Sequence, residues 1–110
     1  MMPYNTDLEE RIDQLALKLG SLTKKKMFGG IGYILNGNMC FGIHKEFLLL
    51  RVSNSKGKEL LKDKKFRPFE MTRHPMPGWV LVGADSIKTD QQLTDMLRLG
   101  LDYAESLPKK

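Results

Sequence analysis

Asn36-Gly37 is the feature that most constrains what this chain can fold into. The dipeptide lies between two runs of alternating apolar residues, and Asn-Gly is the strongest short signal for a two-residue hairpin turn. We therefore expect antiparallel strands at about 26–35 and 38–44. The turn also fixes a register, which pairs Ile34 with Met39, Gly32 with Phe41 and Gly30 with Ile43.

A third strand is expected at about 47–53, after a two-residue turn at Lys45-Glu46. We prefer this register, because a one-residue slip of the strand would turn Arg51 onto the apolar face. This register places Leu48, Leu50 and Val52 opposite Ile43, Phe41 and Met39. The reverse face of the sheet then carries Ile31, Tyr33, Cys40, Phe47 and Leu49.

Helices are expected before and after this meander. Thr6 and Glu9 form the pattern of a capping box at the start of a helix over about 6–19, and Thr89 with Gln92 forms another before a helix over about 90–106. A shorter helix at about 55–62 has Ser55 as its expected cap. Two further strands are expected at about 66–72 and 78–83, joined by a segment that contains Pro75 and Pro77.

The predicted order is therefore α-β-β-β-α-β-β-α, which is typical of a two-layer α+β fold with helices covering an antiparallel sheet. A chain of 110 residues suits one domain over 1–110. The start of the chain lacks the basic and apolar segments of a secretory signal, and Cys40 has no second cysteine for an internal disulfide. We therefore expect a cytoplasmic protein. The net charge of +5 permits acidic partners but does not require them.

Several segments resemble the N-terminal domain of the TfoX/Sxy family of bacterial competence regulators, and they occur in that family's order and spacing. The likeness covers about residues 24–107. The matching segments are Lys25-Lys26-Met27-Phe28-Gly29-Gly30-Ile31-Gly32-Tyr33, Asn36-Gly37-Asn38-Met39, Leu48 to Val52, Arg67-Pro68-Phe69 and Pro75-Met76-Pro77-Gly78-Trp79-Val80.

The resemblance implies a secretion-chaperone-like α+β fold and a regulatory role. Longer members of the family help to activate competence genes together with a DNA-binding transcription factor. The chain ends at Lys110 without the C-terminal domain of those members, so we expect a single-domain member.

No catalytic, cofactor or metal site is expected. Gly29 to Gly32 precede a hairpin, whereas phosphate-binding glycine loops lead from a strand into a helix, so these glycines indicate close packing or a bulge. Cys40 and His44 lie roughly 13 Å apart along one strand at about 3.3 Å per residue, too far for a hydrogen-bonded pair. We interpret Cys40 as a packing residue. His74 has no companion at a metal-ligand spacing.

Three functions are compared. The leading hypothesis is a non-enzymatic regulatory or protein-interaction module. Its simplest form is self-association as a homodimer. The candidate interface consists of Ile31, Tyr33, Phe47, Leu49 and Trp79. The alternative is nucleic-acid binding through two basic clusters, namely Lys24, Lys25 and Lys26, and Lys56, Lys58, Lys62, Lys64, Lys65 and Arg67. The third is a small-ligand carrier or enzyme with a pocket between the glycine strand and the segment from His74 to Trp79.

Overall fold

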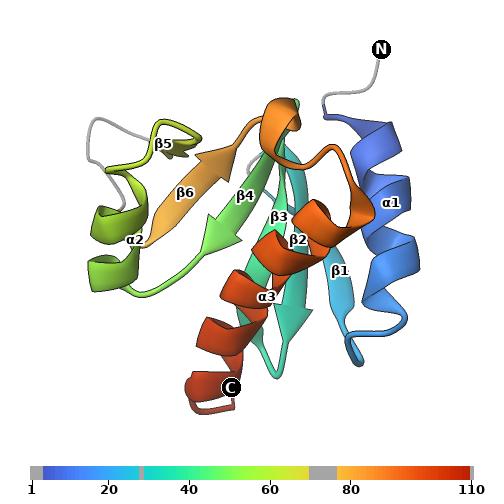
Figure 1. Ribbon diagram of the computed structural model, residues 1–110. Helices are drawn as coiled ribbons and strands as arrows, with labels where there is room; N and C mark the ends of the chain where they lie inside the picture. Colours follow the sequence, from blue (N-terminus) through green and yellow to red (C-terminus); the bar gives the residue numbers. More distant parts are fainter. Residues whose placement is uncertain (1–3, 28, 70–76, 110) are drawn as a thin grey trace.

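The computed structural model describes residues 4–27, 29–69 and 77–109, which form one antiparallel sheet and three α-helices (Figure 1). The sheet has six strands in the order β1-β2-β3-β4-β6-β5. In chain order the elements are α1 Thr6–Ala16, β1 Thr23–Met27, β2 Gly30–Leu35, β3 Asn38–His44, β4 Phe47–Arg51, α2 Asn54–Leu60, β5 Phe66–Pro68, β6 Trp79–Val82, a 3₁₀ turn η1 Ala84–Ser86, and α3 Asp90–Ser106.

The helices gather on one face of the sheet, which we call the helix face. α1 lies over the β1–β2 end, α3 crosses β2, β3 and β4, and α2 packs on β6 near the other end (Figure 1). The α+β class and the predicted order of helices and strands are confirmed, with one strand added.

The added strand is β1, because the single strand predicted at 26–35 is in fact two. Gly29, with φ +73°, lies between β1 and β2, and the left-handed backbone there suits a residue without a Cβ. Three lysines in a row occupy β1, so the strand has none of the apolar alternation that identifies the others. Such lysines are common on edge strands, where they discourage pairing with other chains.

The predicted register of the hairpin is correct only next to its turn. Ile34 pairs with Met39 as expected, but Tyr33 then pairs with Phe41, so Cys40 is an extra residue on β3. This bulge shifts the rest of the hairpin by one residue and pairs Gly32 with Gly42 and Ile31 with Ile43. The predicted pairs Gly32–Phe41 and Gly30–Ile43 are therefore wrong. On the other side of β3 the predicted pairs Ile43–Leu48 and Phe41–Leu50 are confirmed, while Val52 lies beyond β4.

The bulge also corrects which side chains share a face. Ile31, Tyr33 and Cys40 were expected on the reverse face, but they lie in the core under the helices. With them are Phe41, Ile43, Leu48, Leu50, Val80, Val82 and the buried residues of α1 and α3. The other side of the sheet, the second face, has a smaller cluster of Met39, Leu49, Phe69 and Leu81, with Met27, Phe47 and Trp79 packed against it.

The helix caps are partly as predicted. Thr89 and Gln92 form the expected reciprocal capping box at the start of α3. The cap of α1 is Asn5 rather than Thr6, because the Asn5 side chain accepts a hydrogen bond from the backbone N–H of Leu8. The backbone N–H of Asn5 donates to the carbonyl of Lys45, which fixes the start of the helix. Ser53 rather than Ser55 caps α2, by accepting from the N–H of Lys56.

α3 packs closely against the bulged strand through Gly100. A Cβ at this position would collide with the backbone carbonyl of Cys40, so glycine lets the helix approach the sheet backbone directly. Glycine inside a helix costs about 1 kcal/mol relative to alanine. The close contact with β3 is the structural reason for accepting that cost.

We expect Gly100→Ala to lower the free energy of unfolding by about 2 kcal/mol, because overpacking against a backbone atom outweighs the gain in helix propensity. The matched control is Gly83→Ala, since Gly83 has φ −81° and a Cβ there would meet nothing closer than Phe47 at 4.0 Å. Urea unfolding of both variants measures the difference. Equal stability of Gly100→Ala and the wild type would contradict this account of the packing.

Candidate functional site

The five residues of the predicted interface do not form one surface. Ile31 and Tyr33 are 4 % and 2 % exposed and lie beneath the helices, and Leu49 is 2 % exposed on the second face. Only Phe47 and Trp79 are partly exposed. The prediction that these residues share one face is wrong, because it assumed a hairpin without the bulge at Cys40.

On the second face, two methionines cover the paired glycines of the hairpin. The space beside Gly32 is filled by the side chain of Met27, and the terminal methyl of Met39 lies over Gly42. The ring of Phe69 packs against His44, with centroids 5.0 Å apart, and against Trp79 at 6.3 Å. The glycines of β2 therefore serve packing, as their position before the hairpin indicated.

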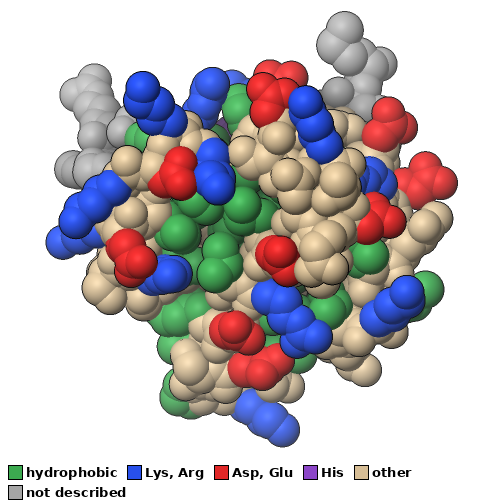
Figure 2. All heavy atoms as spheres, viewed as in Figure 1, with side chains coloured by type: hydrophobic (Ala, Val, Ile, Leu, Met, Phe, Trp, Pro, Cys, Tyr) green, Lys and Arg blue, Asp and Glu red, His purple; other side chains and the backbone are tan. Residues whose placement is uncertain are grey.

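The largest apolar surface in view lies on the helix face between α2 and α3, and we call it the α2–α3 hollow. Figure 2 shows hydrophobic side chains gathered there, bordered by charged ones. The partly buried hydrophobic residues that the two helices contribute beside the core are Leu60, Leu61, Met96 and Leu99, and Phe66 lies between them. Both helices pack on the sheet, α2 on β6 and α3 on β2 to β4, which leaves the hollow between them.

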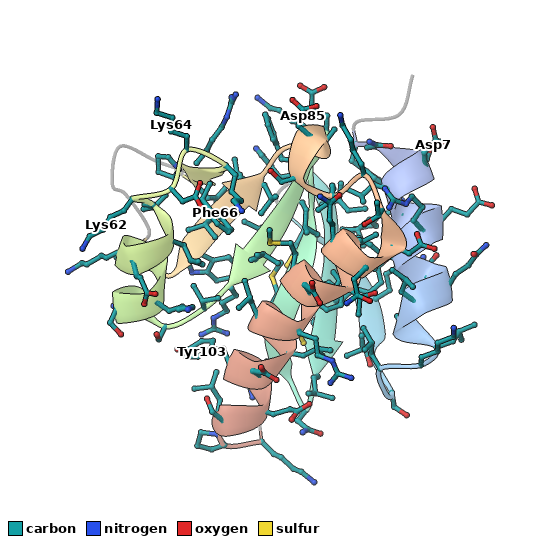
Figure 3. All side chains as sticks on the ribbon, viewed as in Figure 1. Asp7, Lys62, Lys64, Phe66, Asp85 and Tyr103 are labelled. Atoms are coloured by element: carbon teal, nitrogen blue, oxygen red, sulfur yellow. The ribbon has the colours of Figure 1, made fainter. Side chains whose placement is uncertain are left out.

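Arg51 connects β6 to α3 through two aromatic rings. Its guanidinium lies 5.4 Å from the ring of Trp79 and 5.6 Å from the ring of Tyr103, so it stacks between β6 and α3. Figure 3 labels Phe66 above the space between α2 and α3 and Tyr103 below it. One pattern in the sequence could have indicated this surface: Met96 and Leu99 lie beside the buried stripe of α3, and Leu60-Leu61 ends α2.

Beside the hollow, the segment from α2 to β5 concentrates positive charge, and we call it the basic corner. It carries six cations against two carboxylates, which accounts for +4 of the net charge of +5. Its exposed ion pairs, Lys56–Glu59 at 3.6 Å and Lys65–Asp63 at 3.7 Å, contribute little to stability. Arg67 lies over the ring of Phe47 at 5.2 Å. The cations of the basic corner are Lys56, Lys58, Lys62, Lys64, Lys65 and Arg67.

The structure separates the two predicted basic clusters. Lys24, Lys25 and Lys26 lie on β1 at one edge of the sheet, and the basic corner includes β5 at the other. Five inter-strand spacings of about 4.8 Å put these edges roughly 24 Å apart. The two clusters therefore do not form one continuous basic surface.

Lys24 is also held in an internal network that ties α1 to the sheet. Its ammonium donates to Glu9 at 2.8 Å and to Asp13 at 2.9 Å, and both bonds raise the pKa of Lys24. The hydroxyl of Tyr33 donates to the other oxygen of Asp13 at 2.6 Å. Burial and then this bond raise the pKa of Tyr33 well above its ordinary value. Tyr4 completes the network by donating to Glu9 at 3.1 Å.

Cys40, the cysteine considered from the sequence as a reactive group, has a structural role. Cys40 is fully buried, and burial raises the pKa of its thiol to about 11, which confirms it as a packing residue. No group of three or more metal-ligating side chains occurs among the described residues. His74 lies outside them, so the pocket proposed beside it stays a prediction.

No helix among the described residues is long and apolar enough to cross a membrane.

The fold and its surfaces define an α+β domain that has helices on one face of an antiparallel sheet and an apolar hollow beside a basic corner. The family described as the TfoX N-terminal domain matches residues 13–104, and the chain belongs to this family. No curated protein and no solved structure matches the chain.

Replacing Tyr33 by Phe should lower the free energy of unfolding near neutral pH by about 1.5 kcal/mol, because the bond to the charged Asp13 is lost. Because the pKa of Tyr33 is raised in the folded state, its stabilising contribution to the free energy of unfolding is fully present below about pH 10. This contribution is lost as the pH rises toward the folded-state pKa. Chemical denaturation between neutral pH and pH 11 should therefore show a smaller alkaline loss in Tyr33→Phe than in the wild type.

The matched control is Tyr4→Phe, which removes the phenol at the outer, more exposed end of the same network. We expect a smaller effect than for Tyr33→Phe. Two results would show that the buried bond to Asp13 does not hold α1. One is an equal loss of unfolding free energy in the two variants, and the other is a loss of stability at alkaline pH in Tyr33→Phe that equals that of the wild type.

Proposed function

We propose that this chain is a regulatory protein-interaction module of the cytoplasm that acts by binding another protein rather than by catalysis. Membership of the TfoX N-terminal domain family supports the regulatory part. The α2–α3 hollow is the single observation that carries the binding part, because a contiguous apolar surface rimmed by charges is typical of an interface.

The composition of the hollow fits a protein partner. Leucine and methionine side chains from two helices provide adaptable apolar contacts, and Tyr103 and Arg51 are of the residue types enriched at energetically important interface positions. The basic corner adds a polar rim beside this apolar centre. A partner that buries the hollow would therefore gain affinity from apolar area and orientation from charge.

In the source organism, we expect deletion of the gene to change a defined set of transcripts, and wild-type protein to restore them. Met96→Glu places a charge in the hollow and should abolish this rescue. The control Met27→Glu makes the same change in a partly buried methionine on the second face and should rescue fully. Thermal unfolding of both purified variants checks that they are folded.

Two results would count against the proposal. Unchanged transcripts after deletion would remove the regulatory role, and full rescue by folded Met96→Glu would remove the hollow as the contact surface.

Nucleic-acid binding is the second candidate, favoured by the basic corner. Lys58, Lys62 and Lys64 form no ion pair among the described residues, so they are free to neutralise phosphates. If this function holds, anisotropy of labelled duplex and single-stranded DNA should show affinity that falls as salt rises. Lys62→Glu with Lys64→Glu should weaken binding several-fold, and Lys25→Glu on the opposite edge should not. No detectable binding at low salt would eliminate this candidate.

A further inference from the structure

The outer side of β1 is an open edge of the sheet, and we call it the β1 edge (Figure 1). Among the described residues, the backbone of β1 bonds to β2 and to no other element, and four of its five residues are exposed. An edge of this kind offers a row of N–H and C=O groups to a further strand. At the opposite edge, β5 has three residues and includes Pro68, whose nitrogen carries no hydrogen. The β1 edge is therefore the one on the described sheet that suits an added strand.

Two of the three lysines on β1 have no acidic partner. Lys24 is held by Glu9 and Asp13, but Lys25 and Lys26 form no ion pair among the described residues. The register of β1 with β2 places Lys26 on the helix face and Lys25 on the second face. A strand added at the β1 edge would therefore meet one positive charge on each face of the sheet.

These lysines oppose a second copy of the chain as the added strand. Two β1 strands paired about a twofold axis at Lys25 would place Lys25 opposite itself and Lys24 opposite Lys26. Because the three lysines are consecutive, the neighbouring registers also bring lysines together. Like charges directly opposite each other destabilise paired strands, whereas opposite charges stabilise them. The β1 edge therefore favours an acidic segment over a copy of itself.

A cavity of about 710 Å³ lies between the last turn of α1 and the start of β1. Its apolar wall includes Ala16, Leu17 and Leu22, and Lys24 and Tyr33 also line it. Leu17 is 87 % exposed, so this wall is open to solvent. A partner that brought an apolar side chain into the cavity would remove apolar surface from water on both sides.

The cavity is in line with one position of an added strand. Lys24 and Tyr33 are directly paired across β1 and β2, and both line the cavity. Paired residues form a row across a sheet, with strands about 4.8 Å apart. A residue paired with Lys24 on a new strand continues this row on the helix face and brings its side chain toward Leu17. The residues paired with Lys25 and Lys26 face a lysine each.

We propose that the β1 edge binds an extended acidic segment of another protein, which adds a strand to the sheet and places one apolar side chain in the cavity beside Leu17. In an antiparallel pairing, two consecutive acidic residues lie opposite Lys26 and Lys25, and an apolar residue follows opposite Lys24. Main-chain hydrogen bonds then supply affinity, and the three side chains supply specificity. The β1 edge is separate from the α2–α3 hollow, so this inference does not rest on the contact proposed there.

A set of short peptides tests the strand addition. The probe is fluorescein-labelled Ser-Thr-Glu-Glu-Leu-Thr-Ser, and its anisotropy with the purified chain at low salt should show binding that weakens as salt rises. Replacing Glu-Glu by Lys-Lys should weaken binding by about tenfold or more, because both charge pairs become repulsive. N-methylation of both glutamate nitrogens should have a similar effect, since one of two consecutive N–H groups faces the neighbouring strand in either register. Replacing the leucine by serine should weaken binding several-fold.

Matched double charge reversals locate the site on the protein. Lys25→Glu with Lys26→Glu should weaken binding of the probe by about tenfold or more. Lys58→Glu with Lys62→Glu makes the same change in the basic corner and should leave binding unchanged. Leu17→Ser should weaken it several-fold. In hydrogen-exchange NMR, the probe should slow the exchange of those β1 amides that do not bond to β2, and circular dichroism checks that every variant is folded.

Four results would overturn the proposal. Absence of binding at low salt excludes an acidic segment, and binding that survives N-methylation is charge attraction without strand pairing. Equal weakening by the two double reversals places the probe elsewhere. A wild-type dimer whose β1 amides are protected without the probe makes a second copy the occupant. None of these results bears on the α2–α3 hollow, which the Met96→Glu rescue tests.

Discussion

The bulge at Cys40 determines how the sheet presents its side chains. Because β3 carries one extra residue, Tyr33 lies opposite Phe41 and both face the helices, with ring centroids 5.2 Å apart. Without the bulge, Tyr33 would point to the second face and could not donate to Asp13 on α1. The backbone carbonyl of Cys40 also lies where α3 comes closest to the sheet, at Gly100. The positions of both large helices therefore depend on this one irregularity.

The sequence allowed most of the elements to be predicted, because their signals are local. Asn36-Gly37 fixes a turn through its own backbone preference, and Thr89 with Gln92 caps α3 through bonds within four residues. The bulge has no such local signal. The bulge depends on how Cys40 fits beneath α3, a helix that begins about fifty residues later in the chain. A register that is counted outward from the turn is therefore wrong for every pair beyond the bulge.

The candidate site was missed for a related reason. Phe47 and Leu49 were grouped with Tyr33 by counting alternate residues along strands, and that count fails across the bulge. The α2–α3 hollow arises instead from the spacing of two helices that are far apart in sequence, and neither Leu61 nor Met96 alone indicates it. The basic corner could be recognised in the sequence as a lysine cluster. Only the fold shows that it borders an apolar surface and lies at the opposite edge of the sheet from β1.

The basic corner and the lysines of β1 lie too far apart to act as one charged surface. At physiological salt, charges interact over only about 8 Å, so these two clusters, roughly the width of a six-stranded sheet apart, scarcely influence each other. They act on an approaching molecule separately, and a partner with acidic groups opposite the basic corner is oriented before contact. Exposed pairs supply little affinity once formed. Any stable complex on the α2–α3 hollow must therefore gain most of its free energy from burying apolar groups such as Leu61 and Met96, while the charges select the orientation.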